Sequence, residues 1–188
     1  CRFGAVETDG APTGKAVFRI DRFACEGCGI CVEFCPANAI DFPEAPTGTL
    51  FVSDCVAGPL VHARLDIGAE NSGKLVSQVR ARARSLAKEK GLDTILIDGP
   101  PGIACPTIAA LTGATRAVIV TEPTVAAEHD LGRVLGLTAH FQIPADVIVN
   151  KWDLNPDAAR RIEARAQAAG ARIAGRVRYA PEITAAQM

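Results

Sequence analysis

The chain has 188 residues, of which 48% are hydrophobic, and a formal net charge of −1. This length suits one medium-sized domain, or a small domain joined to most of a larger one. The near-neutral charge argues against nucleic acid as a main partner. No apolar run approaches the length that spans a bilayer, so we expect no stable membrane insertion.

Four cysteines lie close together near the start of the chain, in the run Cys25-Glu-Gly-Cys28-Gly-Ile-Cys31-Val-Glu-Phe-Cys35-Pro36. The spacing C-x2-C-x2-C-x3-C-P is the pattern by which ferredoxins hold iron–sulfur clusters. Zinc sites usually use two separated pairs of ligands, and disulfide frameworks suit small secreted domains. The run therefore predicts a [4Fe-4S] site, in which Gly27 and Gly29 let the backbone approach the cluster closely.

The first residue, Cys1, has a sequence context similar to that of Cys35. Three residues separate each cysteine from a small residue and then an aliphatic one, Ala5-Val6 in one case and Ala39-Ile40 in the other. In two-cluster ferredoxins the last cysteine of each motif binds the other cluster. We therefore predict that Cys1 completes a cluster with Cys25, Cys28 and Cys31, and that Cys35 belongs to a second cluster whose other ligands lie upstream. Cys1 as an unrelated thiol is the alternative.

A domain boundary is predicted after residue 57, because the Pro- and Gly-containing stretch 42–48 reads as a loop and the pattern changes near Gly58. Residues 1–57 are then a partial ferredoxin-like domain, small and α+β, and residues 58–188 a second domain. Expected strands in the second domain are Leu60–Leu65, Thr94–Asp98, Arg116–Thr121, Asp146–Asn150 and Arg172–Val177. Expected helices are Ser72–Lys90, capped by Asn71 or Ser72 and by Gly91, then Pro106–Leu111, Val125–His140 and Asp157–Ala169.

Aliphatic strands that alternate with helices predict an α/β fold with a parallel sheet, whose ligands bind at the carboxyl ends of the strands. Two polar strings follow such strands. One is Asp98-Gly99-Pro100-Pro101-Gly102, in which an aspartate after an aliphatic run is typical of a magnesium–nucleotide site. The other is Asn150-Lys151-Trp152-Asp153, which is compatible with either adenine or guanine. Ordinary loop positions are the alternative for both strings.

A further string, Gly68-Ala69-Glu70-Asn71-Ser72-Gly73-Lys74, fits the first part of a phosphate loop. A phosphate loop requires Ser or Thr next, because that hydroxyl binds magnesium, and here Leu75 follows. We therefore interpret Ser72–Lys74 as the start of a helix, with Lys74 facing solvent or a partner.

These motifs together resemble one family, the MinD/ParA/Mrp-type P-loop ATPases that carry an inserted ferredoxin domain. The resemblance rests on the cysteine run, on 70–76, on Ile97–Gly102, on Thr121-Glu122-Pro123-Thr124 and on the Asn150–Asp153 string. It implies a SIMIBI-type core without its first strand and phosphate loop, so that the chain is an interior piece of a longer protein. It further implies that Asp98 acts on magnesium as the catalytic residue, and that Gly99, Pro100 and Gly102 form the turn that senses the γ-phosphate. Asn150, assisted by Asp153, would contact the base.

The resemblance also implies ATP and Mg2+ as cofactors of the intact protein, a homodimer, and a redox or iron–sulfur acceptor protein as partner. We expect a cytoplasmic protein that couples its nucleotide state to electron transfer or cluster handling, and that is an ATPase only when intact. The isolated chain should bind ATP weakly and hydrolyse little. Two alternatives remain: a simple ferredoxin-type electron carrier on an α/β scaffold, and an iron–sulfur cluster carrier or assembly scaffold.

Overall fold

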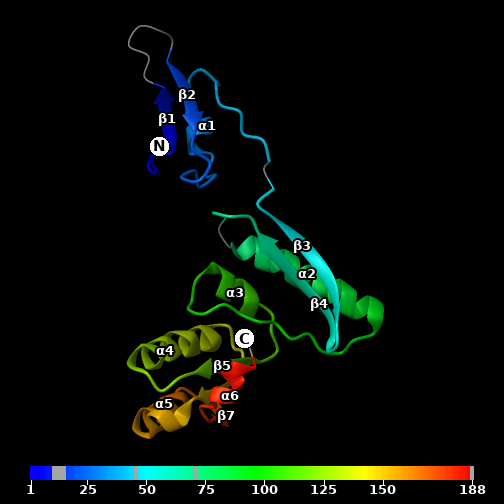
Figure 1. The fold of residues 1–188 in the computed structure, drawn as a ribbon, viewed down its shortest axis with the longest axis vertical. Coiled ribbons are helices and arrows are strands. Elements are labelled where there is room, and N and C mark those ends of the chain that lie inside the picture. Colours follow the sequence, from blue (N-terminus) through cyan, green and yellow to red (C-terminus); the bar gives the residue numbers. More distant parts are fainter. Residues whose placement is uncertain (10–15, 45, 70–71, 187–188) are drawn as a thin grey trace. The chain divides into compact units, whose positions relative to one another are not determined.

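The computed structural model describes residues 1–9, 16–44, 46–69 and 72–186 (Figure 1). The chain divides into two compact units. The first comprises residues 1–49 and 64–70, and the second comprises residues 50–63 and 71–188. The domain boundary after residue 57 stays a prediction. None of the helices in the described ranges combines the length and the apolar character needed to cross a membrane.

A small antiparallel pair of strands begins the first unit. β1 (Val6–Asp9) pairs with β2 (Val17–Ile20), with Val6 opposite Ile20. The pair is closed by a hydrogen bond of 2.8 Å from the Asp21 amide to the Ala5 carbonyl, and the Ala5 side chain is buried. The cysteine run follows and contains a single short helix, α1 (Ile30–Glu33).

A two-stranded sheet follows the cysteine run in the sequence. β3 (Gly48–Cys55) and β4 (Gly58–Leu65) form it, joined by a short turn. Across it the ring of His62 stacks on Phe51, and its Nε2 atom lies 3.0 Å from Ser53 Oγ. The predicted strand at 60–65 is therefore confirmed, but its expected place in the parallel sheet is wrong, because the adjacent β3 takes it as a partner.

The longest helix is α2 (Gly73–Lys90), which packs against α3 (Cys105–Leu111). Ser72 caps α2 by accepting a hydrogen bond from the Leu75 amide, and Gly91 ends it in the left-handed conformation, with φ 64°. These caps confirm the prediction from the sequence. Asn71, the alternative cap, lies outside the described residues.

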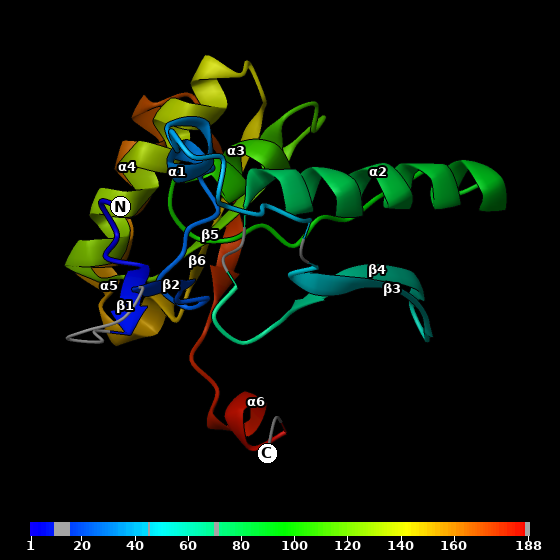
Figure 2. The same cartoon turned by 90° about the horizontal axis from the view of Figure 1, so that it is seen from above.

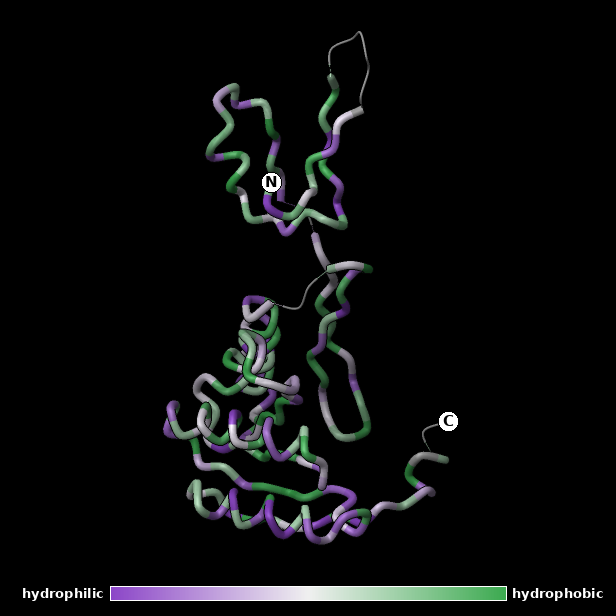
Figure 3. The backbone as a smooth tube through the Cα atoms, turned by 90° about the vertical axis from the view of Figure 1, so that its left-hand side faces the viewer, coloured by the Kyte–Doolittle hydropathy of each residue, from purple (hydrophilic) through white to green (hydrophobic). Residues whose placement is uncertain are grey.

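The second unit also contains a three-stranded parallel sheet, in the order β5 (Ala117–Thr121), β6 (Ala145–Asn150) and β7 (Arg172–Val177). Ile119 lies opposite Val147, and Asn150 opposite Val177. The predicted parallel pairing is confirmed for these strands. In Figure 3 hydrophilic residues (purple) recur along the helical coils, interleaved with hydrophobic ones (green), as expected of helices with one face toward a sheet.

Two helices pack on this sheet, α4 (Val125–His140) against β5 and α5 (Pro156–Ala168) against β6 and β7 (Figure 2). Their apolar faces and the central strand enclose the core, which consists of Leu131, Leu135, Val147, Val149, Ala159, Ile162, Ala166 and Ala171. A short 3-10 turn (Trp152–Leu154) follows β6, and α6 (Pro181–Ala185) follows β7. The core holds the carboxyl end of β6 in a fixed place.

Ion pairs between Asp146 and two arginines fix the amino end of β6. Asp146 is buried, and its carboxylate accepts hydrogen bonds from Arg116 at 2.9 Å and from Arg172 at 2.7 and 3.0 Å. The hydrogen bonds from Arg172 and then from Arg116 hold the pKa of the Asp146 carboxyl well below its usual range. One carboxylate thus joins the segments that lead into all three strands.

The expected strand Thr94–Asp98 does not form. Residues 92–100 carry no strand or helix, and the side chain of Leu96 is 95% exposed. An extended aliphatic stretch becomes a strand only when a neighbour supplies its ladder of hydrogen bonds. Within residues 1–9, 16–44, 46–69 and 72–186 no strand pairs with this stretch, so the prediction is wrong for this structure.

Candidate functional site

The cysteine run forms a loop that bends at its glycines. Gly27 and Gly29 have φ values of 60° and 72°, which side-chain-bearing residues rarely adopt. Gly29 also begins α1, since its carbonyl accepts hydrogen bonds from the Val32 and Glu33 amides at 3.0 and 3.2 Å. A Cβ atom at Gly29 would lie 3.5 Å from the ring of Phe42. The loop conformation therefore depends on glycine at both positions.

The thiols of the run are accessible. Cys1, Cys25 and Cys28 are exposed, whereas Cys31 and Cys35 are half-buried, and all five are free thiols. The described ranges contain no three His, Cys, Asp or Glu side chains that converge as metal ligands. The structure thus places the five predicted ligands on one unit without bringing them together at coordination distance. Cys1 as a ligand stays a prediction.

Cys35 has the most distinctive surroundings of these cysteines. Its Sγ atom accepts a hydrogen bond from the Ala39 amide at 3.4 Å. This bond, with those from the Ala37 and Asn38 amides, lowers the pKa of the Cys35 thiol. Asn38 supports this turn with a φ of 47°. A thiol in such an amide cradle is a thiolate more readily, and the thiolate is the form that binds metal.

The second candidate site begins with the loop after Asp98. Asp98 and Gly99 are exposed, and Pro100 and Gly102 are half-buried, with Gly102 at φ 79°. The buried Thr107 of α3 donates a hydrogen bond shared between the Pro100 and Pro101 carbonyls, at 3.5 and 3.4 Å. The first turn of α3 thereby holds the loop after Asp98.

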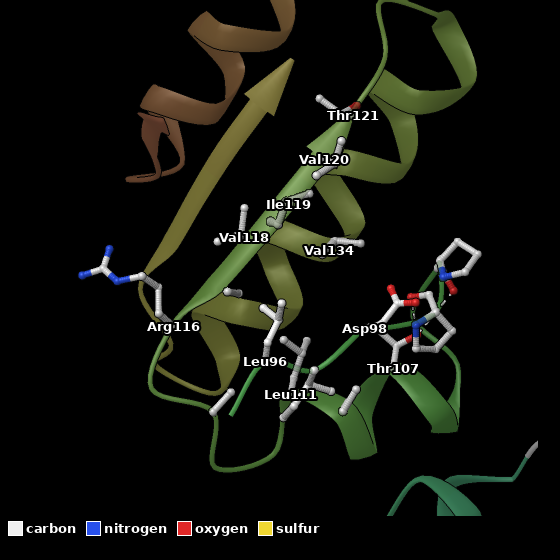
Figure 4. A pocket seen from close by; sticks show the side chains of 18 of the residues that line it. Leu96, Asp98, Thr107, Leu111, Arg116, Val118, Ile119, Val120, Thr121 and Val134 are labelled. Carbon is white, nitrogen blue, oxygen red and sulfur yellow. Dashed lines mark hydrogen bonds between the residues drawn. The ribbon is translucent and has the colours of Figure 1, made fainter. Parts of the chain in front are cut away.

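A cavity of about 870 Å3 is lined by both this loop and β5. Figure 4 shows Leu96, Asp98 and Thr107 on one side, and Val118, Ile119, Val120 and Thr121 along β5 on the other. Asp98, Gly99, Pro100 and Gly102 all line it, together with Thr121 and Glu122. Asn150 and Asp153 do not, so the cavity unites only part of the predicted nucleotide site.

Asn150 and Asp153 are engaged within the protein. The Asn150 Oδ1 atom accepts a hydrogen bond from the Lys151 amide at 3.0 Å, and Asp153 Oδ1 accepts one from the Tyr179 amide at 2.7 Å. Lys151 has a left-handed backbone, with φ 53°. Asp153 thus holds the chain where it leaves β7, a contact that the sequence did not reveal.

The Lys151–Glu122 ion pair is a further contact at this edge that sequence reasoning missed. Lys151 Nζ lies 2.6 Å from Glu122 Oε1, which links the residues that follow β5 and β6. Both residues stand directly after aliphatic strands, and that position was the available signal. The pairing itself depends on the strand order, which the sequence does not display.

Comparison with known proteins identifies one of these two regions. Residues 18–41 match the 4Fe-4S binding domain family. The chain therefore contains a ferredoxin-type iron–sulfur domain, of the kind found in electron-transfer proteins.

Two relatives come from Methanocaldococcus jannaschii. The uncharacterized protein MJ0578 is 30% identical over 138 residues, which are 73% of this chain and 48% of that protein. The uncharacterized protein MJ0579 is 25% identical over 156 residues, which are 82% of this chain and 53% of that protein. The chain thus spans about half the length of these curated relatives, and their names assign no activity.

The residues of the 4Fe-4S domain fit a cluster by their chemistry. The matched residues 18–41 include Cys25, Cys28, Cys31 and Cys35, whose thiolates are the ligands that such clusters take. Two left-handed glycines leave the loop free of side chains at its bends, and backbone amides face the Cys35 sulfur. Hydrogen bonds to ligand sulfurs are one of the means by which proteins set cluster potentials.

Proposed function

We propose that the protein is an iron–sulfur protein in which nucleotide binding to the α/β unit changes the contacts of the 4Fe-4S domain with a redox or cluster-receiving partner. The observation that carries the iron–sulfur part is the C-x2-C-x2-C-x3-C-P run inside the matched residues 18–41. A bound [4Fe-4S] cluster supplies one-electron redox chemistry. The exposed Cys25 and Cys28 lie where a partner can approach closely.

Support for the nucleotide part comes from the second unit. Asp98 and the glycine-containing turn after it follow an aliphatic stretch, and the turn is held by Thr107. In the proposal Asp98 orients a magnesium ion, the turn to Gly102 responds to the terminal phosphate, and Asn150 contacts the base. ATP is proposed as the nucleotide, because the Asp153 carboxylate, which would read guanine, accepts the Tyr179 amide instead.

Anaerobic reconstitution with iron and sulfide tests the iron–sulfur part. We expect about four iron atoms per protein chain and the broad visible absorption of thiolate-bound iron, both lost in Cys28→Ala. Cys105→Ala is the matched control, because Cys105 is also an exposed free thiol but lies outside the matched run. Equal iron content in the two variants would contradict the assignment.

Nucleotide binding is tested on the protein from its complete coding sequence, by calorimetric titration with Mg-ATP and Mg-GTP. We expect Asp98→Asn to weaken Mg-ATP binding at least about tenfold, because it removes one charge from the proposed magnesium site. Asp157→Asn, an exposed carboxylate on α5, should leave binding unchanged. If the wild type binds neither nucleotide, the electron-carrier alternative is the better account.

A further inference from the structure

The string Gly68–Lys74 is not used by the proposed function, because it lacks the hydroxyl of a phosphate loop. It contains the position at which the chain leaves the first unit, after residue 70, and continues into the second. The chain also passes between the units after residues 49 and 63, but both of those positions lie inside the strands β3 and β4. The link at 68–73 differs from them because it joins a turn to the start of a helix.

The first glycine of this link contacts the residue that leads into the cysteine run. Gly68 has a φ of 81°, and a Cβ atom there would lie 3.1 Å from the Cδ1 atom of Phe23. The Phe23 amide donates a hydrogen bond of 2.9 Å to Asp21 Oδ1, two positions before the first cysteine of the run. The Ala69 amide donates one of 3.0 Å to the Asp66 carbonyl, which closes a turn around Gly68. Within the first unit, a fixed turn therefore lies against the start of the cysteine run.

The second glycine of the link contacts the first residue of α3. A Cβ atom at Gly73, where α2 begins, would lie 3.1 Å from the Cys105 carbonyl oxygen. This separation is shorter than a relaxed van der Waals contact, so α2 begins this close to α3 only because the residue is glycine. Further along α2, the buried Arg80 donates a hydrogen bond to the Ala109 carbonyl of α3. Within the second unit, α2 and α3 are thus joined at two points.

The first turn of α3 also holds residues 99–102, the turn that is proposed to respond to the nucleotide. Thr107 Oγ1, two positions after Cys105, donates to the Pro100 and Pro101 carbonyls at 3.5 and 3.4 Å. A displacement of this nucleotide-responsive turn would therefore displace the start of α3, against which Gly73 packs. Closely packed elements transmit such shifts because protein interiors have low compressibility.

We propose that residues 68–73 are a coupling segment, through which the nucleotide-responsive turn changes the conformation of the cysteine run. Its anchors are the Gly73–Cys105 contact in the second unit and the Gly68–Phe23 contact in the first. The proposal rests on the proposed nucleotide function and adds the route by which the nucleotide state reaches the 4Fe-4S domain. Five peptide units span at most about 18 Å when fully extended, so the segment absorbs little of a displacement at either anchor.

Hydrogen exchange measured by mass spectrometry, with and without Mg-ATP, tests this route on the reconstituted protein from the complete coding sequence. In the wild type we expect Mg-ATP to slow the exchange of 99–107 and to change that of 24–33 by at least about threefold. In Phe23→Ala the response at 99–107 should persist and the response at 24–33 should be lost, because the ring that Gly68 contacts is absent. Phe34→Ala is the matched control and should respond like the wild type, since the two rings are 77% and 79% exposed and both lie beside cysteines of the run.

Gly73→Ala tests the other anchor and leaves the cysteine run unchanged. Its methyl group would press on the Cys105 carbonyl, so the contact between α2 and α3 must shift. Gly136→Ala, also inside a helix, is the matched control, because a Cβ atom at Gly136 has no neighbouring atom within 4 Å. The response of 24–33 to Mg-ATP should fall by at least about half in Gly73→Ala and stay unchanged in Gly136→Ala. Iron content measured on both variants verifies that the 4Fe-4S domain is loaded.

The failure of the coupling segment is distinguishable from the failure of the nucleotide function. If Mg-ATP changes the exchange of 99–107 and not that of 24–33 in the wild type, nucleotide binding stands and the coupling segment is overturned. If the response at 24–33 survives in both Phe23→Ala and Gly73→Ala, the assignment to residues 68–73 is overturned. If Mg-ATP changes neither region, both proposals are overturned. A reduced response at 24–33 in these two variants, with both controls unaffected, supports the coupling segment.

Discussion

Ile162 offers a direct test of the core that holds the carboxyl edge of the sheet. Its side chain is completely buried between α5 and the strands, in contact with a cluster that includes Leu131, Val147 and Val149. Because Val147 and Val149 are themselves fully buried in strand β6, the site can collapse little when atoms are removed. Ile162→Ala should therefore create a cavity that persists.

The expected loss of unfolding free energy is about 3 kcal/mol for Ile162→Ala and about 1 kcal/mol for Ile162→Val. The higher helix propensity of alanine offsets only about 0.4 kcal/mol of the first value. For a chain of this length each kcal/mol lowers Tm by about 2–4 °C, so the alanine variant should melt about 6–12 °C lower.

Urea unfolding followed by far-ultraviolet circular dichroism measures this loss. The long helices α2, α4 and α5 all belong to the second unit, so the helical signal reports on that unit. Ile183→Ala is the control, because Ile183 is 54% exposed on α6 and should change stability by less than about 0.5 kcal/mol. A loss below about 1 kcal/mol for Ile162→Ala, with an unchanged urea dependence, would refute the packing argument.

Three further predictions concern the ends of the strands. Because the pKa of the Asp146 carboxyl is lowered in the folded protein, its charge stabilises the fold above about pH 4, and this contribution is lost as the pH falls further. Tm should therefore drop more steeply between about pH 5 and about pH 2 in the wild type than in Asp146→Asn. Asp153→Ala removes the acceptor for the Tyr179 amide, so limited proteolysis after β7 should accelerate, and it should accelerate less in Asp153→Asn. Equal proteolysis rates for the wild type and both variants would contradict the anchoring role of Asp153. Thr124 caps α4, and Thr124→Ala should cost about 1 kcal/mol in urea unfolding whereas Thr124→Ser should cost little.

The sequence predicted the elements whose signals are local. The helices at 73–90, 125–140 and 156–168 have side-chain caps at Ser72, Thr124 and Asn155, and three of the expected parallel strands form within one residue of their predicted bounds. Caps and aliphatic runs act over a few residues, so they are visible without knowledge of the fold.

The errors concern features that depend on a distant partner. Thr94–Asp98 has the composition of a strand, but a ladder requires a neighbour, and composition cannot supply one. The β3–β4 pair was missed because its turn at 56–57 lies in the stretch interpreted as a domain boundary. The Lys151–Glu122 pair joins residues that are 29 positions apart, and only the strand order brings them together.

The cysteine run was the most informative part of the candidate site, because its spacing alone predicted an iron–sulfur site, and residues 18–41 match the 4Fe-4S binding domain family. The nucleotide residues were harder to predict. Asp98 and Thr121 line one cavity, whereas Asn150 and Asp153 lie outside it and already bond to the chain. Strand ends indicate a general location, and the distances between them depend on which strands are neighbours.

Trp152 is the only tryptophan of the chain, and it lies directly after the central strand, with the Arg176 guanidinium 5.1 Å from its ring centroid. Arg176 is fixed in turn by two hydrogen bonds of 2.6 Å to Glu163. Indole emission therefore originates from a single, well-anchored position next to the Lys151–Glu122 pair. Trp152 fluorescence can therefore report, without an added label, on conformational changes near the Lys151–Glu122 pair. The visible absorption of the iron–sulfur domain can be recorded from the same sample.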